Sequence, residues 1–395
     1  MFFRWLHEHV AFKPWRPAVE CVLRLGSRVV DFCGKRVKAI WHAALHVPKP
    51  ARLIPSQLKQ IVVIRPDRIG DAVLSTPALR ALRQAAPQAR ITVIASTAAA
   101  PFMRLLTSID EVLVVPGDRL ADWWRARRLL QPLRDAKPDC VIVLQSAWPA
   151  ALLGWWLKGS HRVGFNAGGM GWLFTDAVPY PFLKRKEPQV LVNLYLLQAA
   201  GIPTPPADSV QLEAPITGKG RAEADVWLCK QGCDDKRLLV VIHPGSRSKY
   251  TQWAPEKFAI ISDKLASDPN NQVVLLCGPH EEAIVERVMR TMRNSVFVAK
   301  DLPLETVIAL LERSALFIGN ATGTMHLASA VCRKVVAIIG GTHPQDCPER
   351  WGPWGKDHRI VHKTPEETIG RSTWDWVGPE GLGFIQPEDV LTAIR

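Results

Sequence analysis

Apolar residues occur along most of this chain in short continuous runs, separated by segments in which they recur at helical spacing. In the first half the runs lie at 59–65, 89–96, 111–116 and 139–145. Runs of Val and Ile without polar alternation are typical of strands covered on both faces, as in a parallel sheet. The spacing after the first run predicts a helix over 71–85. The stretch 141–157 contains Gln145, Ser146 and Pro149, so it predicts a buried strand followed by a helix and falls short of a membrane span.

A second series of the same kind begins near Arg237. It predicts strands at 237–243, 271–278, 296–298, 315–320 and 334–341, and helices at 254–266, 280–292, 304–313 and 323–332. Strands that alternate with helices build a doubly wound parallel sheet, and such sheets bind ligands at the carboxyl ends of their strands. The sequence therefore predicts an α/β protein with two Rossmann-like domains that face a central cleft.

Shifts in composition divide the chain into five segments. They are a basic amphipathic N-terminal extension (1–57), a first Rossmann-like domain (58–205), a Pro-rich linker (206–220), a second Rossmann-like domain (221–365) and a C-terminal segment (366–395). We expect the C-terminal segment to pack back on the first domain.

The formal charge of +13 is concentrated at the N-terminus, where ten Lys or Arg and three acidic residues precede position 56. A basic amphipathic helix with tryptophans suits an anionic membrane surface, and it equally suits a helix that packs on its own domain with a solvated basic face. No basic-aromatic platform or helix-turn-helix pattern supports a nucleic-acid partner. The eight cysteines are scattered without metal-ligand spacing. We expect a cytoplasmic protein without a zinc site.

Three strand-to-loop junctions of the second series carry candidate chemistry. HPGSRSKY contains Ser246, Arg247 and Lys249, CGPHEE contains Glu281, and GNATGTMH contains Thr322, Gly323 and His326. A helix that starts at a glycine offers free N–H groups to phosphate and lets the ligand approach the backbone. Each junction alone has an ordinary explanation, a helix cap for Thr322 and a core histidine for His326. Together at one sheet edge they predict a diphosphate site.

In the first domain, the strand at 59–65 ends in RPDRIGD. Asp71 is either the cap of the helix that follows or a catalytic base at the top of the sheet. Arg65 and Arg68 suit an acceptor that bears carboxylates or phosphates, or they form a solvated basic loop. The chain has no dinucleotide fingerprint, Walker A motif or H-E-x-x-H motif, which argues against dehydrogenases, P-loop NTPases and zincins.

Several segments, in order, resemble glycosyltransferase family nine, the ADP-heptose:lipopolysaccharide heptosyltransferases. They are VVIRPDRIGDAVLSTPALRALRQAAPQARITVIAS, DCVIVLQSAWPAALL with HRVGFN, VVIHPGSRS with WAPEKFA, and IGNATGTMHLASAV with VVAIIGGTHPQDCPERWGPWG. The resemblance implies a GT-B fold, in which the second domain holds the donor nucleotide and the first holds the acceptor. It also implies inverting transfer without an obligatory metal or other cofactor.

Residue by residue, the resemblance assigns the catalytic aspartate to Asp71. It assigns nucleotide and phosphate contacts to Ser246, Glu281, Thr322, Gly323, His326, Gly341 and Thr342. Arg247 and Lys249 would offset the charge of the leaving group. The chain departs from the family at Ala321, where an aspartate is usual, and at Thr251, where a lysine is usual.

The function expected from the resemblance is transfer of heptose from ADP-heptose to a core sugar of lipopolysaccharide, an anionic glycolipid, at the cytoplasmic face of the inner membrane. Two alternatives stay open. The chain is a GT-B transferase that uses another nucleotide sugar for a different glycan or protein acceptor, or a degenerate homologue that binds a nucleotide or glycan without catalysis.

Overall fold

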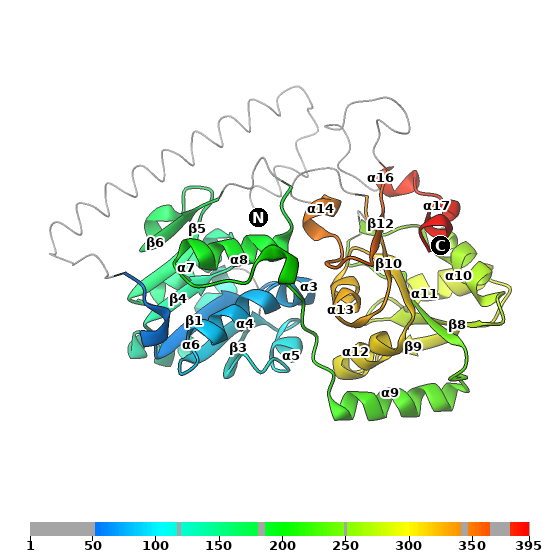
Figure 1. Ribbon diagram of the computed structural model, residues 1–395, viewed down its shortest axis with the longest axis horizontal. Coiled ribbons are helices and arrows are strands. Elements are labelled where there is room, and N and C mark those ends of the chain that lie inside the picture. The colour runs from blue at the N-terminus through cyan, green and yellow to red at the C-terminus, as the bar shows by residue number, and fades with distance from the viewer. Residues whose placement is uncertain are drawn as a thin grey trace, which may run out of the picture.

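The computed structural model describes residues 52–116, 120–180, 186–248, 251–340, 347–363 and 380–394. The predicted N-terminal extension therefore lies outside the described residues, except for 52–57. Two six-stranded parallel sheets, each flanked by helices, lie side by side (Figure 1). This arrangement confirms the predicted pair of Rossmann-like domains.

The first sheet has the strand order β3-β2-β1-β4-β5-β6. Its strands are β1 (Gln60–Arg65), β2 (Arg90–Ser96), β3 (Glu111–Val115), β4 (Cys140–Val143), β5 (His161–Asn166) and β6 (Asp176–Pro179). The order reverses between β1 and β4, where Ile64 pairs with Val143. In open α/β sheets this reversal creates the crevice in which ligands bind.

The second sheet repeats this topology in the order β12-β11-β10-β7-β8-β9. Its strands are β7 (Leu238–His243), β8 (Asn271–Cys277), β9 (Phe297–Lys300), β10 (Leu316–Asn320), β11 (Val335–Ile338) and β12 (Arg359–Val361). The reversal lies between β7 and β10, where Gly319 pairs with His243. The loops that follow the strands predicted at 237–243 and 315–320 therefore line the same crevice.

Helices cover both faces of each sheet, as continuous apolar strands require. In the first domain they are α3 (Ile69–Val73), α4 (Thr76–Ala85), α5 (Ala100–Met103), α6 (Leu120–Ala136), α7 (Trp148–Trp156) and α8 (Gln189–Ala199). In the second they are α9 (Gly218–Gln231), α10 (Pro255–Ala266), α11 (Glu282–Thr291), α12 (Leu304–Arg313), α13 (Gly323–Val331), α14 (Pro348–Trp351), α16 (Glu380–Gly383) and α17 (Pro387–Ile394). Short 3-10 turns occupy Pro55–Gln57, Gly171–Leu173 and Ala207–Ser209. No helix among the described residues has both the length and the apolar character needed to cross a membrane.

The helix predicted over 71–85 is in fact two helices, α3 and α4, with a break at Leu74 and Ser75. Pro77 lies in the first turn of α4, where its missing N–H costs no hydrogen bond. The carbonyl of Leu74 accepts a hydrogen bond from Asn193 of α8, and the Ser75 hydroxyl donates to the carbonyl of Asp71. The break therefore separates a short helix that carries Asp71 from the longer helix that packs on the sheet.

The described part of the C-terminal segment packs on the second domain, contrary to the prediction that it returns to the first. Ile385 and Val390 are fully buried in an apolar cluster with strands of the second sheet. The carbonyl of Ile385 accepts hydrogen bonds from the Trp253 indole at 3.0 Å and from Lys257 at 2.7 Å. The segment therefore completes the core of the second domain.

We expect Ile385→Ala to lower the free energy of unfolding by about 2–4 kcal/mol, because it removes fully buried methyl groups and leaves a cavity. Ile260→Ala is the matched control, because that side chain is 53% exposed on α10 and its truncation costs under about 1 kcal/mol. Urea denaturation of both variants measures the difference. Equal stabilities would contradict this packing of the C-terminal segment.

Candidate functional site

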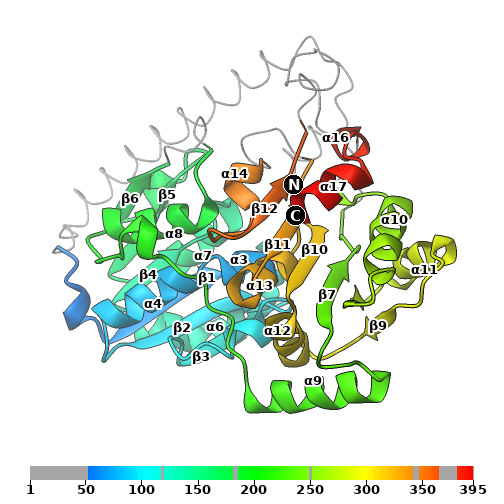
Figure 2. The same cartoon turned by 45° about the vertical axis from the view of Figure 1, so that its right-hand side comes forward.

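The two domains meet at a contact between the backbones of Gly70 in α3 and Gly323 in α13. A Cβ atom on Gly70 would lie 2.8 Å from Cδ2 of His326 and 3.3 Å from the Cα of Gly323. A Cβ atom on Gly323 would lie 3.2 Å from the backbone nitrogen of Gly70. Figures 1 and 2 show α3 beside α13 at the centre of the molecule. Glycine at both positions therefore allows the two helix starts to touch.

Asp71 is the third residue of α3, whose N-cap position is Arg68, so Asp71 is not the helix cap. Its side chain is 21% exposed, and its Oδ1 lies 3.2 Å from Nη2 of Arg65. The carboxylate thus keeps access to solvent while a guanidinium fixes its direction.

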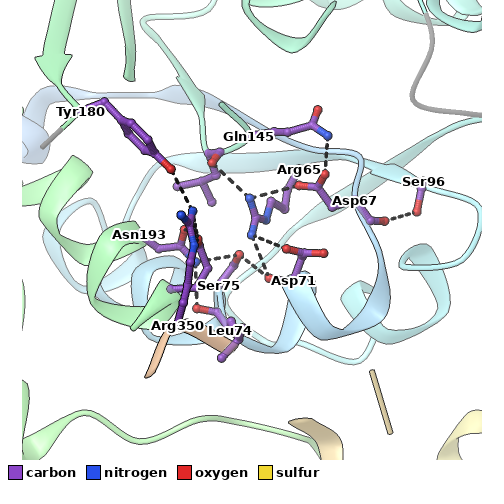
Figure 3. A network of polar contacts seen from close by, with 12 residues as sticks. Arg65, Asp67, Asp71, Leu74, Ser75, Ser96, Gln145, Tyr180, Asn193 and Arg350 are labelled. Atoms are coloured by element: carbon purple, nitrogen blue, oxygen red, sulfur yellow. Dashed lines mark hydrogen bonds and ion pairs between the residues drawn. The ribbon is translucent and has the colours of Figure 1, made fainter. Parts of the chain in front are cut away.

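The Arg65 side chain is buried at the end of β1, and both terminal nitrogens of its guanidinium contact protein groups (Figure 3). Its Nη1 donates to the carbonyl of Leu144 at 3.1 Å and forms an ion pair with Asp67 at 3.1 Å. Gln145, which follows β4, donates a hydrogen bond to Asp67. Arg65 therefore joins the ends of β1 and β4 and orients Asp71. Arg68, the other arginine of this loop, is exposed.

A cleft of about 500 Å³ opens between the domains beside this contact. From the first domain it is lined by Arg68, Ile69 and Ala98. From the second it is lined mainly by the loops after β7, β8 and β10, which include Ser246, Arg247, Glu281, Thr322 and Gly323. The structure thus brings together predicted residues that are up to 255 positions apart, from Arg68 to Gly323.

The second-domain wall of the cleft is organised by a hydrogen-bonded row of Glu281, His243 and Thr322. Glu281 Oε2 lies 2.9 Å from His243 Nε2 and accepts the Gly278 amide at 2.9 Å. On the other side of the ring, His243 Nδ1 lies 3.4 Å from the Thr322 hydroxyl. Burial alone would raise the pKa of Glu281, but the hydrogen bond and charge of His243 and the Gly278 amide hold it below its usual value. Glu281 is therefore an anion at neutral pH.

The loop after β7 is tied to the start of α13 by Asn320, which is fully buried. Its side chain donates to the carbonyls of Pro244 and Gly245 at 3.0 and 3.1 Å and accepts the Trp253 amide at 2.9 Å. In the same loop, the hydroxyls of Ser246 and Thr251 lie 2.7 Å apart. Thr251, where the family usually has lysine, thus supports the loop.

The start of α13 lines the cleft through Thr322 and Gly323, the first N–H groups of a helix have no acceptor within it, and this nine-residue helix adds its dipole. Arg247 supplies a cation from the second domain and Arg68 one from the first. Such a cradle can hold a phosphate or diphosphate.

His326 lies behind the cleft wall and packs against Gly70, without lining the cleft itself. Burial lowers the pKa of its imidazole to about 4, while the nearby Asp71 carboxylate opposes part of that shift. The ring is therefore neutral at pH 7 and fills the contact between the domains. Its Nδ1 has no hydrogen-bond partner among the described residues.

The far end of the cleft is more apolar, where Leu276, Leu302, Leu304 and Val307 line it with Asp301. A flat aromatic base fits such a wall, since ligand pockets combine apolar surface with a few polar groups. Sequence reasoning missed this end because most of its residues lie inside predicted strands and helices, while Asp301 and Leu302 lie in the short connection before the helix predicted at 304–313. It also assigned no role to His243, which directly follows an apolar run, or to Asp67, which lies three residues after one, and that position is the signal that could have found them. Lys249, Gly341 and Thr342 lie outside the described residues.

A profile of glycosyltransferase family 9 (heptosyltransferase) matches residues 126–373. Among curated relatives, lipopolysaccharide heptosyltransferase 2 of Salmonella typhimurium is 24% identical over 302 residues, which are 73% of this chain and 85% of that protein. Lipopolysaccharide heptosyltransferase 3 of Escherichia coli is 28% identical over 72% of this chain and 82% of its own length.

Solved structures share the fold. The family 9 glycosyl transferase from Veillonella parvula superposes with a TM-score of 0.72 at 24% identity, covering 87% of this chain and 98% of that one. The ADP-heptose lipopolysaccharide heptosyltransferase II of E. coli gives a TM-score of 0.68 at 20% identity, covering 85% and 97%. The family match spans more than half of the chain, and the two facing sheets agree with it: this chain belongs to glycosyltransferase family 9 and is a glycosyltransferase.

Proposed function

We propose that the protein transfers heptose from ADP-heptose to a core sugar of lipopolysaccharide, with inversion at the anomeric carbon and with Asp71 as the general base. The observation that carries the proposal is the contact of α3 with the start of α13, because it sets a partly exposed carboxylate beside an anion cradle. The names of the heptosyltransferase relatives support the sugar and the acceptor class.

In the proposed reaction the acceptor hydroxyl attacks the anomeric carbon as the bond from that carbon to the diphosphate oxygen breaks. Asp71 takes the hydroxyl proton during attack, which is a contribution of roughly 10²–10⁴-fold to the rate. A single displacement of this kind inverts the anomeric configuration, and it needs the base and the leaving group on opposite sides of the sugar. Asp71 and the start of α13 come from different domains, which suits that requirement.

The leaving diphosphate gains charge as its bond to the sugar breaks. Thr322, Gly323 and Arg247 line the cleft in which that charge would develop, so the amides at the start of α13 and the guanidinium can stabilise it. Lys249, Gly341 and Thr342 stay proposed donor contacts, and no metal is part of the proposal. Glu281, held as an anion by His243, suits hydroxyls of the donor better than its phosphates.

For the acceptor, the proposal assigns anionic groups of the glycolipid to Arg68, which is exposed, and gives Arg65 the task of holding Asp71. The basic N-terminal extension remains a proposed contact with the cytoplasmic face of the inner membrane. Because the acceptor is lipid-anchored, an electrostatic contact of this kind would raise its local concentration.

We expect Asp71→Asn to lower kcat by roughly 10²–10⁴-fold, because the amide cannot accept the hydroxyl proton. The affinity for ADP should change less than about threefold, since Asp71 does not line the cleft. Transfer from ADP-heptose to purified core acceptor, with calorimetric titration of ADP, measures both.

The matched control is Asp67→Asn, which neutralises the other carboxylate on Arg65. The kcat of Asp67→Asn should fall by no more than about tenfold, because Asp67 positions Arg65 and would not accept the hydroxyl proton. A kcat close to normal in a folded Asp71→Asn variant would exclude Asp71 as the general base.

We expect ADP to raise the melting temperature more than UDP or GDP does at equal concentration. A nucleotide at about 100 times its Kd stabilises the folded state by about 2.7 kcal/mol, which is a shift of several degrees. Thr322→Val should reduce the shift with ADP, because it removes the hydroxyl at the start of α13. A larger shift with UDP or GDP would favour the alternative of another nucleotide sugar.

A further inference from the structure

A chain of hydrogen bonds connects the second domain to the helix that carries Asp71 (Figure 3). It begins at Arg350 in α14, whose side chain reaches across to the first domain. There its Nη2 donates to the Tyr180 hydroxyl at 2.8 Å and to Gln189 Oε1 at 2.7 Å, and its Nε donates to the same Oε1 at 3.1 Å. Arg350 therefore donates two hydrogen bonds to one amide oxygen.

From Gln189 the chain continues through buried groups. Gln189 and Asn193 lie one turn apart on α8 and are 5% and 0% exposed. Gln189 Nε2 donates to Asn193 Oδ1 at 3.0 Å, and Asn193 Nδ2 donates to the carbonyl of Leu74 at 2.9 Å and to Ser75 Oγ at 3.4 Å. The Ser75 hydroxyl donates to the carbonyl of Asp71 at 2.7 Å.

The direction of donation is the same at every step, from the guanidinium to the carbonyl of Asp71. An arginine can only donate, so its presence forces Gln189 to turn Oε1 toward it and Nε2 toward Asn193. That orientation in turn sets the Asn193 amide, which donates to the end of α3. Hydrogen bonds aligned in this way strengthen one another.

We propose that Arg350 is a positioning residue that couples docking of the two domains to the alignment of α3 and its Asp71 carboxylate. The inference rests on the proposed function, because it concerns the proton acceptor of that reaction. When the domains separate, Arg350 leaves Gln189, the buried amides lose the donor that orders them, and the carbonyls at the end of α3 lose a fixed partner. The base is then aligned only while the domains are together.

A second link at this interface is an ion pair that does not connect to α3. Lys186 lies 3.0 Å from Glu349, the residue before Arg350, and the two side chains are 50% and 47% exposed. An exposed ion pair of this kind contributes little to stability. It connects the same two segments without touching Gln189 or α8, so it provides a matched control.

The test uses the full chain with Arg350→Met and Lys186→Met. Arg350→Met should lower kcat by about ten- to hundredfold, as expected for loss of a charged hydrogen-bond donor from a buried partner. The Kd for ADP should stay within about twofold, because Arg350 does not line the cleft. For Lys186→Met, kcat and the Kd for ADP should both stay within about twofold of the values for the parent chain. Arg350→Lys should recover part of the rate, since lysine keeps the charge but lacks the planar guanidinium that donates two hydrogen bonds to Gln189.

A double-mutant cycle with Gln189→Met tests the route. If Arg350 acts through Gln189, the double variant should be no slower than the slower single variant, whereas independent residues give losses that multiply. Small-angle scattering with ADP present should show a larger radius of gyration for Arg350→Met than for the parent chain.

Normal kcat in Arg350→Met, or losses that multiply in the cycle, would overturn the inference. A parallel fall of kcat, ADP affinity and melting temperature would also overturn it, because it would indicate a purely structural residue. If the parent chain transfers no heptose, the proposed function fails on its own, and the scattering comparison still decides whether Arg350 holds the domains together.

Discussion

The contact between Gly70 and Gly323 is the constraint on which the rest of the site depends. It lies where two helix starts, each after a strand at the carboxyl end of a parallel sheet, meet from different domains, and the absence of side chains lets the two backbones touch. One residue further along α3 stands Asp71, and at the start of α13 stand the free amides of an anion cradle. A methyl group on either glycine would force the two helix starts apart, and with them the carboxylate and the cradle.

Around this contact, some charged side chains pair within the protein and others face the cleft. On the first domain, the buried Arg65 forms ion pairs with the partly exposed Asp67 and Asp71, so its charge is used within the protein to fix the Asp71 carboxylate. On the second domain, the Glu281 carboxylate is hydrogen-bonded to His243 and the Gly278 amide in a row that ends at Thr322. The cations left facing the cleft are therefore Arg68 and Arg247 among the described residues that line it. Glu281 and Asp301 line the same cleft, so the groups that can attract an anion are these two arginines and the start of α13.

Much of the fold was predictable because local pattern and tertiary structure agree. The helix predicted at 304–313 has those bounds, and the strands at the centre of each sheet are continuous apolar runs. The strand β5 and the edge strand β6 beside it escaped prediction, because HRVGFN and DAVP carry polar residues, a glycine and a proline. Gly164 in β5 leaves space for the Phe174 ring, which a Cβ atom would meet at 2.3 Å. Such a requirement depends on tertiary packing.

The candidate site was predictable in its residues but not in its connections. Motif positions named Asp71, Ser246, Glu281 and Thr322, while Arg65 in its buried role and the link from Arg350 to α8 depend on residues that the sequence separates widely. A crystal structure with ADP-heptose, or with an analogue that cannot be transferred, would show where the diphosphate and the sugar bind. We expect the diphosphate at the start of α13 and the anomeric carbon between it and the Asp71 carboxylate. A diphosphate bound elsewhere, or an Asp71 carboxylate turned away from the sugar with the domains together, would contradict it.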